Sequence, residues 1–264
     1  MPSNFASKGA EGYEASMGRW SALLATPFLD FSGVPPRGRV LDAGCGTGSL
    51  TRALAAHPEL EVIEALDFDE DFIAALRRRT TDSRIRAQRG DVCELPYENG
   101  AFDGVYSLLV LHFVSDAHRA VREMRRVLRP GAVAAATVWA HGGMPSWRLF
   151  WDTVLAREPE AADKGVLPGK RPLTGEGELR AAFEDAGFAG VADTRLTIPM
   201  AYADFDDFWY PTAYGQGTFG NFFGALPEAR RDWLRDEVRA AYLAGNEDGP
   251  RVFESFAWAV RGTA

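Results

Sequence analysis

The sequence is poor in cysteine and in long apolar runs, and each shortage excludes a class of protein. Its two cysteines, Cys45 and Cys93, are too few and too far apart for a zinc site or a disulfide framework, so we assign them no chemistry. No apolar run approaches the roughly 18 residues of a membrane span, and residues 1–16 lack the apolar core of a signal peptide. We therefore expect a cytoplasmic protein without a membrane partner.

Positive charge is also scarce. The chain has 29 Lys and Arg against 37 Asp and Glu, a formal net charge of −8. The negative electrostatic field of this net charge opposes tight, sequence-independent binding to nucleic acid or to an anionic membrane, so we expect neither as a partner. The arginine-rich stretches 77–79 and 84–89 are expected to form a solvated helix face and a strand edge.

The chain lacks the lysine that two classes of nucleotide-binding protein require. The lysines are Lys8, Lys164 and Lys170, and none belongs to the Gly-Lys-Ser/Thr of a P-loop or to a Tyr-x-x-x-Lys pair of short-chain dehydrogenases. These absences exclude a P-loop and disfavour a nicotinamide oxidoreductase.

The first half of the chain alternates strand and helix patterns, within 264 residues of which 46% are hydrophobic. Strands are expected at residues 40–42, 61–66, 84–88, 102–111 and 132–139. Helices are expected after Gly48, over residues 70–79, and from the N-cap Asp116 to the stop signal Pro130 and Gly131. This rhythm predicts a Rossmann-like, doubly wound α/β fold with a mostly parallel sheet.

The second half departs from this rhythm. Helices are expected at residues 146–157 and near 179–187, and two further strands at 191–198 and 253–260 bring the sheet to seven. Between those strands, nine aromatics lie from Tyr202 to Phe223, and we interpret this segment as a helical insertion laid over the sheet. We expect its aromatics to do both: most form a core for the cap, and a minority face a flat or apolar substrate. The expected layout is one domain: an N-terminal lid helix (1–38), a cofactor-binding core (39–140), and a helical cap (141–190 and 199–250).

The stretch VLDAGCGTG, residues 40–48, places a bare turn between the first strand and its helix. Such a turn lets a nucleotide-like ligand approach the backbone at a helix N-terminus. The dinucleotide fingerprint G-x-G-x-x-G would need glycine where Ser49 stands. Asp67 ends the second strand, where a carboxylate can accept hydrogen bonds from both hydroxyls of a ribose.

Taken in order, VLDAGCGTG (40–48), ALDFD (65–69), RGDVCELPY (89–97) and FDGVYSLLVLHFVSD through RVLRPG (102–131) resemble the motifs of class I S-adenosylmethionine-dependent methyltransferases. The branch that they most resemble contains small-molecule and quinone methyltransferases. The resemblance covers about residues 10–140. One departure is Ala132, where the family usually has a second glycine; alanine there costs ~1–2 kcal/mol if that residue must adopt a positive φ.

The resemblance implies S-adenosylmethionine as the cofactor and assigns its contacts. Gly44 and Gly46 would hold the methionine and ribose parts, with Asp42 near the ammonium group. The remaining implied contacts are Asp67 to the ribose hydroxyls, Phe68 against the adenine, Asp91 and Val92 at the adenine edge, and backbone from Leu108. An N-terminal helix that closes over the cofactor would let Tyr13 or Arg19 reach its carboxylate; alternatively, that helix is only stapled to the surface by Trp20.

Two histidines are candidate catalytic residues. His112 follows the fourth strand and could accept a proton from a nucleophile, or could simply be bonded to a loop carbonyl. His141, after the fifth strand, is the second candidate. No metal is expected.

The sequence thus predicts a methyltransferase that moves a methyl group to O, N or C of a small apolar or aromatic acceptor. The alternatives are a non-methylating protein of the same fold, such as a cyclase or a cofactor-binding regulator, and, less favoured, an NAD-dependent oxidoreductase.

Overall fold

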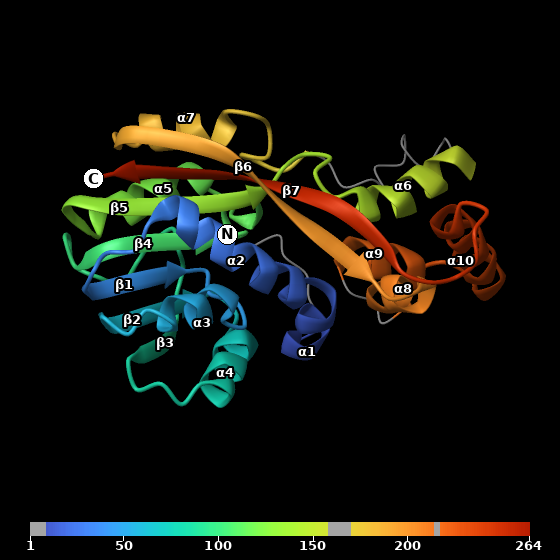
Figure 1. Cartoon of the computed structure of the whole chain (residues 1–264), viewed down its shortest axis with the longest axis horizontal. Helices are drawn as coiled ribbons and strands as arrows, with labels where there is room; N and C mark the ends of the chain where they lie inside the picture. Colours follow the sequence, from blue (N-terminus) through green and yellow to red (C-terminus); the bar gives the residue numbers. More distant parts are fainter. Residues whose placement is uncertain (1–8, 158–169, 214–216) are drawn as a thin grey trace.

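A single seven-stranded sheet organises the chain (Figure 1). The structure is a computed structural model that describes residues 9–157, 170–213 and 217–264. The strand order is β3-β2-β1-β4-β5-β7-β6; the strands β1 to β5 pair in parallel and β7 runs antiparallel to both neighbours. The strands are β1 Gly38–Ala43, β2 Leu60–Asp67, β3 Ile85–Arg89, β4 Phe102–Leu108, β5 Leu128–Trp139, β6 Ala189–Tyr202 and β7 Arg251–Thr263. The predicted fold class is confirmed.

Helices cover both faces of the sheet because the buried strands are apolar on both sides. Val40 of β1 and Ile63 of β2 face the layer formed by α2 (Arg19–Ser32), α3 (Ser49–Ala55) and α4 (Glu70–Arg79). Leu41 of β1 and Leu66 of β2 point to the opposite face, which α5 (Ala117–Arg126) and α7 (Glu178–Asp185) cover. The alternation of side chains along each strand therefore divides the core in two.

The predicted N-cap Asp116 is confirmed, and Asp69 caps a second helix. The Asp69 side chain accepts hydrogen bonds from the first turn of α4, and Asp116 accepts one from Arg119 N at the start of α5. The predicted end of α5 at Pro130 is wrong, because Leu128 already pairs with Phe102 of β4 and the helix stops at Arg126.

The loop after β4 also begins earlier than the apolar run suggests. Leu109 adopts φ 62° and leaves the strand at its carboxyl end, and a short 3-10 helix, η2 (Leu111–Phe113), follows. Ala132 does not have a positive φ, so the alanine at this position carries no such strain.

The second-half helices α6, α8, α9 and α10 lie beyond the carboxyl ends of β1, β4 and β5 (Figure 1). Their bounds are α6 Pro145–Arg157, α8 Phe205–Ala213, α9 Gly217–Gly224 and α10 Glu228–Leu243. Of the sheet, α6 contacts β7 and α8 contacts β6. The long strands β6 and β7 extend past the ends of the parallel strands and connect this cap to the rest of the sheet. Residues 158–169, which follow α6, lie outside the described residues.

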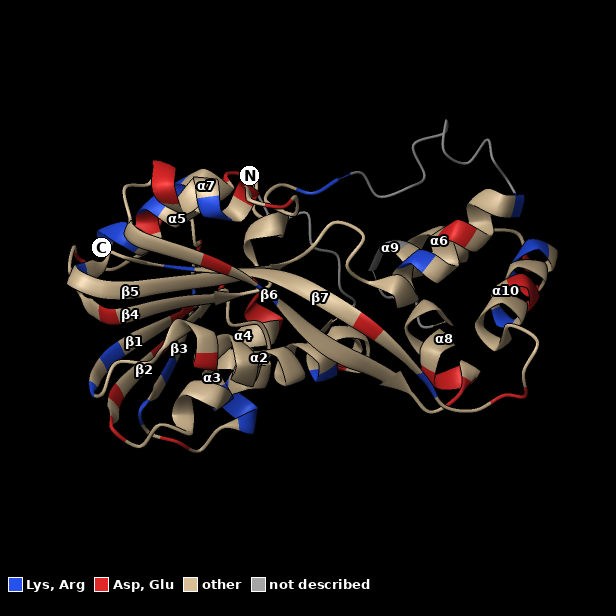
Figure 2. Cartoon of the chain, turned by 45° about the horizontal axis from the view of Figure 1, so that its top comes forward, with Lys and Arg blue, Asp and Glu red and all other residues tan. Residues whose placement is uncertain are grey.

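Basic and acidic residues are interspersed along the helices and strands (Figure 2). Arg84 shows why the arginine-rich stretches need no outside partner: its guanidinium donates to the carbonyls of Ala55, His57 and Leu60 and pairs with Asp82. Within residues 9–157, 170–213 and 217–264, no helix is long and apolar enough to cross a membrane.

Candidate functional site

A cavity of about 630 Å³ opens at the carboxyl ends of β1, β2, β4 and β5. The strand order reverses between β1 and β4, which is where open α/β sheets bind their ligands. This volume lies within the range of small-molecule sites. The cavity joins the loops after these strands to the N-terminal helices and to α6.

The glycine turn forms one wall. The backbone N–H groups of Gly44 and Cys45 both donate to Leu66 O, at 2.7 and 2.9 Å, which ties the turn to β2. Gly44 has φ 86°, and a Cβ there would lie 2.4 Å from a methyl of Val110. Gly46 has φ 52°, but a Cβ there would meet only the Tyr13 ring at 3.8 Å. The turn is bare because Gly44 packs tightly and Gly46 faces the cavity.

Asp67 stands beside this turn at the end of β2. One carboxylate oxygen accepts from Gly46 N at 2.8 Å and the other from Asp69 N at 2.9 Å. Burial raises the pKa of this carboxyl, and the backbone hydrogen bonds oppose the shift. Each oxygen retains a lone pair for a ligand.

The adenine side predicted from the sequence also lines the cavity. Phe68 is 43% exposed, and the Arg89 guanidinium lies 5.3 Å from its ring centre. Asp91 accepts from Cys93 N at 2.8 Å, which fixes its turn, and Val92 is buried next to it. Leu108 lines the cavity from the end of β4.

Asp42 lies behind the glycine turn and does not line the cavity. It is fully buried, and one of its oxygens accepts from Thr51 Oγ1 at 2.6 Å while Oδ1 has no hydrogen-bond partner in the described structure. Burial raises the pKa of this carboxyl to about 7. Asp42 can therefore change its charge near neutral pH without touching a ligand.

The N-terminal helices cover the turn. They are α1 (Gly9–Tyr13), a π-helical turn η1 (Glu14–Gly18), and α2. Tyr13 lines the cavity, shares a 3.2 Å hydrogen bond with Ser21 and lies against Phe72 of α4, with ring centres 5.1 Å apart. Glu14 accepts from Thr47 in the glycine turn and pairs with Arg79 at 2.9 Å.

Arg19 does not line the cavity. Its guanidinium donates twice to the Asp207 carboxylate of α8, at 2.8 and 3.1 Å, and lies over the Trp20 ring. Arg19 therefore connects the N-terminal helices to the cap.

His112 is 3% exposed and lines the cavity from η2. Burial and the nearby charge of Arg171 lower the pKa of its imidazole to about 3, so the ring is neutral at pH 7. Its Nδ1 has no hydrogen-bond partner among the described residues. The alternative, a hydrogen bond from this histidine to a loop carbonyl, is not found among the described residues.

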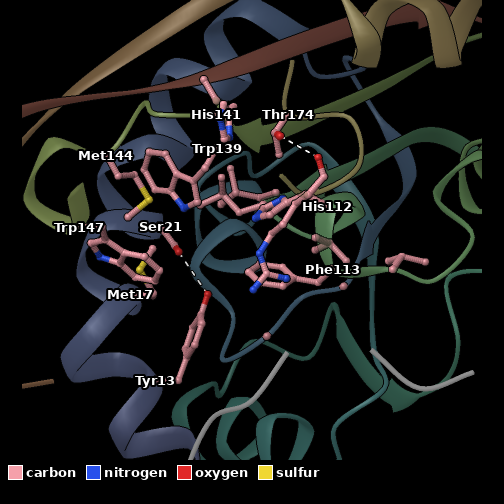
Figure 3. A pocket seen from close by; sticks show the side chains of 18 of the residues that line it. Tyr13, Met17, Ser21, His112, Phe113, Trp139, His141, Met144, Trp147 and Thr174 are labelled. Carbon is pink, nitrogen blue, oxygen red and sulfur yellow. Dashed lines mark hydrogen bonds between the residues drawn. The ribbon is translucent and has the colours of Figure 1, made fainter. Parts of the chain in front are cut away.

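The opposite wall comes from the loop after β5 and from α6. His141 is exposed, lines the cavity, and donates its backbone N–H to Thr174 O at 2.8 Å. Figure 3 shows Met144 and Trp147 on the other side of the cavity from Phe113. Trp139 and Trp151 complete this apolar end.

The expected core among the aromatics of the cap is present, but the expectation that a minority of them face this cavity is wrong. None of the described residues from Tyr202 to Phe223 lines the cavity. These rings pack on one another and on α6: Phe205 stacks on Trp209 with ring centres 5.6 Å apart, and Phe150 contacts Phe219 at 5.0 Å. Arg171 was also missed, since nothing in the sequence marks it as part of a site.

All the sequence-predicted site residues except Arg19 and Asp42 thus meet at one cavity. Cys45 and Cys93 are buried, and burial raises the pKa of both thiols, which keeps them unreactive. Among the residues that the structure describes, no group of three His, Cys, Asp or Glu is placed to hold a metal ion.

Known proteins share both sequence and fold with this chain. Residues 41–136 match the family Methyltransf_11, a methyltransferase domain. A demethylmenaquinone methyltransferase of Staphylococcus aureus is 31% identical over 183 residues, which cover 64% of this chain and 75% of the relative.

Two solved structures are similar in fold. One is the complex between the Haloferax volcanii Trm112 methyltransferase activator and a methyltransferase (TM-score 0.60, 20% identity, covering 97% of this chain and 94% of that chain). The other is the [4+2]-cyclase SpnF (TM-score 0.56, 19% identity, 92% and 80%).

The sheet order, with its antiparallel strand and its glycine turn beside an acidic strand end, defines a Rossmann-like fold for a nucleoside cofactor. The chain belongs to the class I S-adenosylmethionine-dependent methyltransferases, and S-adenosylmethionine is its cofactor. The residues fit this cofactor, which carries an ammonium and a sulfonium and has no phosphates. Among the described lining residues, the end of the cavity beside the glycine turn has Asp67 and Asp91 and no lysine or arginine.

Proposed function

We propose that the protein transfers the sulfonium methyl group of S-adenosylmethionine to O, N or C of a small apolar or aromatic acceptor. The observation that carries this proposal is that a single cavity has an acidic end beside the glycine turn and an apolar end lined by Met144, Trp147 and Trp151. The name of the Staphylococcus aureus relative, a quinone methyltransferase, supports a flat aromatic acceptor.

In this proposal the cofactor contacts are those expected from the sequence, with two changes. Asp67 takes the ribose hydroxyls, Phe68, Asp91 and Val92 hold the adenine, and backbone at Gly44, Gly46 and Leu108 holds the rest. Asp42 acts through its charge from behind the turn, because it does not line the cavity. Tyr13 covers the cofactor, whereas Arg19 is occupied by Asp207.

The cofactor supplies an electrophilic methyl group, and the chain supplies alignment and exclusion of water. Tyr13 and Met17 on one side and the tryptophans on the other keep the acceptor dry. His112 is a weak base with a pKa of about 3, so it can orient an acceptor by hydrogen bonding rather than remove its proton. His141 is the remaining candidate for proton transfer.

The test is incubation with methyl-labelled S-adenosylmethionine and a panel of phenols, hydroquinones and amines. Label should pass to at least one aromatic acceptor, with equal release of the demethylated cofactor. Tight cofactor binding without transfer to any member of the panel would overturn the proposed acceptor class and would favour chemistry such as cyclisation.

A further inference from the structure

Arg171 lines the cavity next to His112 and is held in place by its own loop. Its guanidinium lies over the Phe113 ring, 4.3 Å from the ring centre. Its carbonyl accepts from Thr174 Oγ1 at 2.8 Å, and Thr174 O in turn accepts from His141 N. Leu173 between them adopts φ 63°, a conformation that is costly for a branched side chain. The loop therefore holds this shape at a cost in backbone strain.

Arg171 differs from two nearby basic residues, Lys170 and Arg148, in its charge pairing. Within residues 9–157, 170–213 and 217–264, no carboxylate pairs with it, although its neighbour Lys170 pairs with Glu178. Arg148, the other arginine among the described lining residues, pairs with Asp152 at 3.3 Å. Burial lowers the pKa of the Arg171 guanidinium, as expected where a cation is partly removed from water without a partner.

Two buried polar atoms in the lining residues also lack partners. His112 Nδ1 and Trp151 Nε1 have no hydrogen bond in the described structure. An indole N–H only donates, so any partner of Trp151 Nε1 must be an acceptor atom. Buried polar groups left unpaired are rare in proteins, and in a ligand cavity a bound molecule can supply their partner.

Building on the proposed function, we propose that the methyl acceptor carries an anionic oxygen, a carboxylate or a phenolate, which pairs with the Arg171 guanidinium. The planar fork of arginine suits a carboxylate bidentately and a phenolate by one charge-assisted bond. An ionised oxygen that itself takes the methyl needs no base, since the O–C bond forms as the C–S electron pair returns to sulfur.

The test measures binding of two anionic probes and their neutral analogues to the protein loaded with S-adenosylhomocysteine. Benzoate is compared with benzamide, and 4-nitrophenolate with nitrobenzene, by calorimetry at pH 8. At least one anion should bind tenfold or more tightly than its analogue; the pair that shows this identifies the source of the oxygen. Arg171→Gln should abolish the preference and Arg171→Lys should restore part of it.

The matched control is Arg195→Gln, because Arg195 also stacks on a phenylalanine, Phe256 at 3.8 Å, but does not line the cavity. It should leave the preference intact. Equal binding of anions and neutral analogues, no binding of either anion, or a preference unchanged in Arg171→Gln would each overturn the inference. Cofactor affinity, measured separately, should be unchanged in all variants. If the protein binds cofactor and methylates only neutral acceptors, the pairing of the acceptor with Arg171 is refuted, but the proposed function is not.

Discussion

The Asp67 carboxylate accepts a hydrogen bond from the backbone N–H of Gly46 at 2.8 Å. This bond joins the end of β2 to the glycine turn after β1, two segments that meet only because their strands are parallel neighbours. One side chain therefore both shapes the turn and presents oxygen to the cavity.

Asp67→Asn should weaken S-adenosylmethionine binding by about tenfold or more, because loss of a hydrogen bond to a charged group costs about 1.5 kcal/mol or more. Titration calorimetry measures this directly. Asp69→Asn is the control, since Asp69 caps α4 without lining the cavity and asparagine caps equally well. Equal affinity of the Asp67 variant and the wild type would remove Asp67 from the cofactor site.

Gly44 and Gly46 should respond differently to alanine. Both have positive φ, which costs about 1 kcal/mol or more for a side chain. Only at Gly44 does the new Cβ collide, 2.4 Å from Val110. In urea unfolding of the free protein, Gly44→Ala should lose roughly 2 kcal/mol more than Gly46→Ala, in the range of an overpacked core. Equal losses in the free energy of unfolding would show that the loop at Val110 moves to accommodate the new Cβ.

Asp42 should make stability depend on pH near neutrality. Its folded pKa of about 7 lies above the ordinary value of 3.8, so the folded state holds the proton more tightly than the unfolded state. The stability that this proton contributes is full below about pH 4 and is lost as the pH rises through 7, up to ~4 kcal/mol in all.

The measurement is the free energy of unfolding from pH 5 to pH 8 for the wild type and for Asp42→Asn. The wild type should lose stability relative to the variant across this range, because asparagine cannot ionise. Parallel curves would mean that Asp42 titrates in its ordinary range despite its burial.

The core of the fold could be predicted because its signals are local. The apolar strands β1, β2 and β4, the cap Asp116 and the glycine turn each depend on a few adjacent residues. The cofactor end of the cavity follows from them, since parallel strands end at one edge of the sheet.

The acceptor end could not be predicted because its residues meet through the cap. A run of aromatics such as 205–223 has the same composition whether it faces a ligand or a core. The structure packs Trp209, Phe219 and Phe222 against α6, and α6 lines the cavity instead. Arg19 was misassigned for a similar reason: its partner Asp207 is 188 positions away in the sequence.

The N-terminal lid should slow cofactor release. Glu14 connects it to Thr47 and Arg79, at a partly exposed ion pair worth about 0.5–1 kcal/mol. Glu14→Gln should therefore raise the dissociation rate of S-adenosylmethionine two- to fivefold in stopped-flow experiments, with little change in association. Glu11→Gln, on the exposed side of α1, is the matched control. Equal release rates in the two variants would show that these helices do not hold the cofactor.

His112 should affect turnover without setting its pH dependence. With a pKa of about 3 the imidazole is neutral from pH 5.5 to 8.5, so it does not titrate where the enzyme is assayed. His112→Ala should lower kcat about tenfold, as one hydrogen bond to the acceptor is lost, and should leave cofactor affinity within twofold. The pH profile of kcat should keep its shape and move down uniformly. Loss of a limb of that profile in the variant would instead identify His112 as the proton acceptor, and unchanged turnover would remove it from the acceptor site.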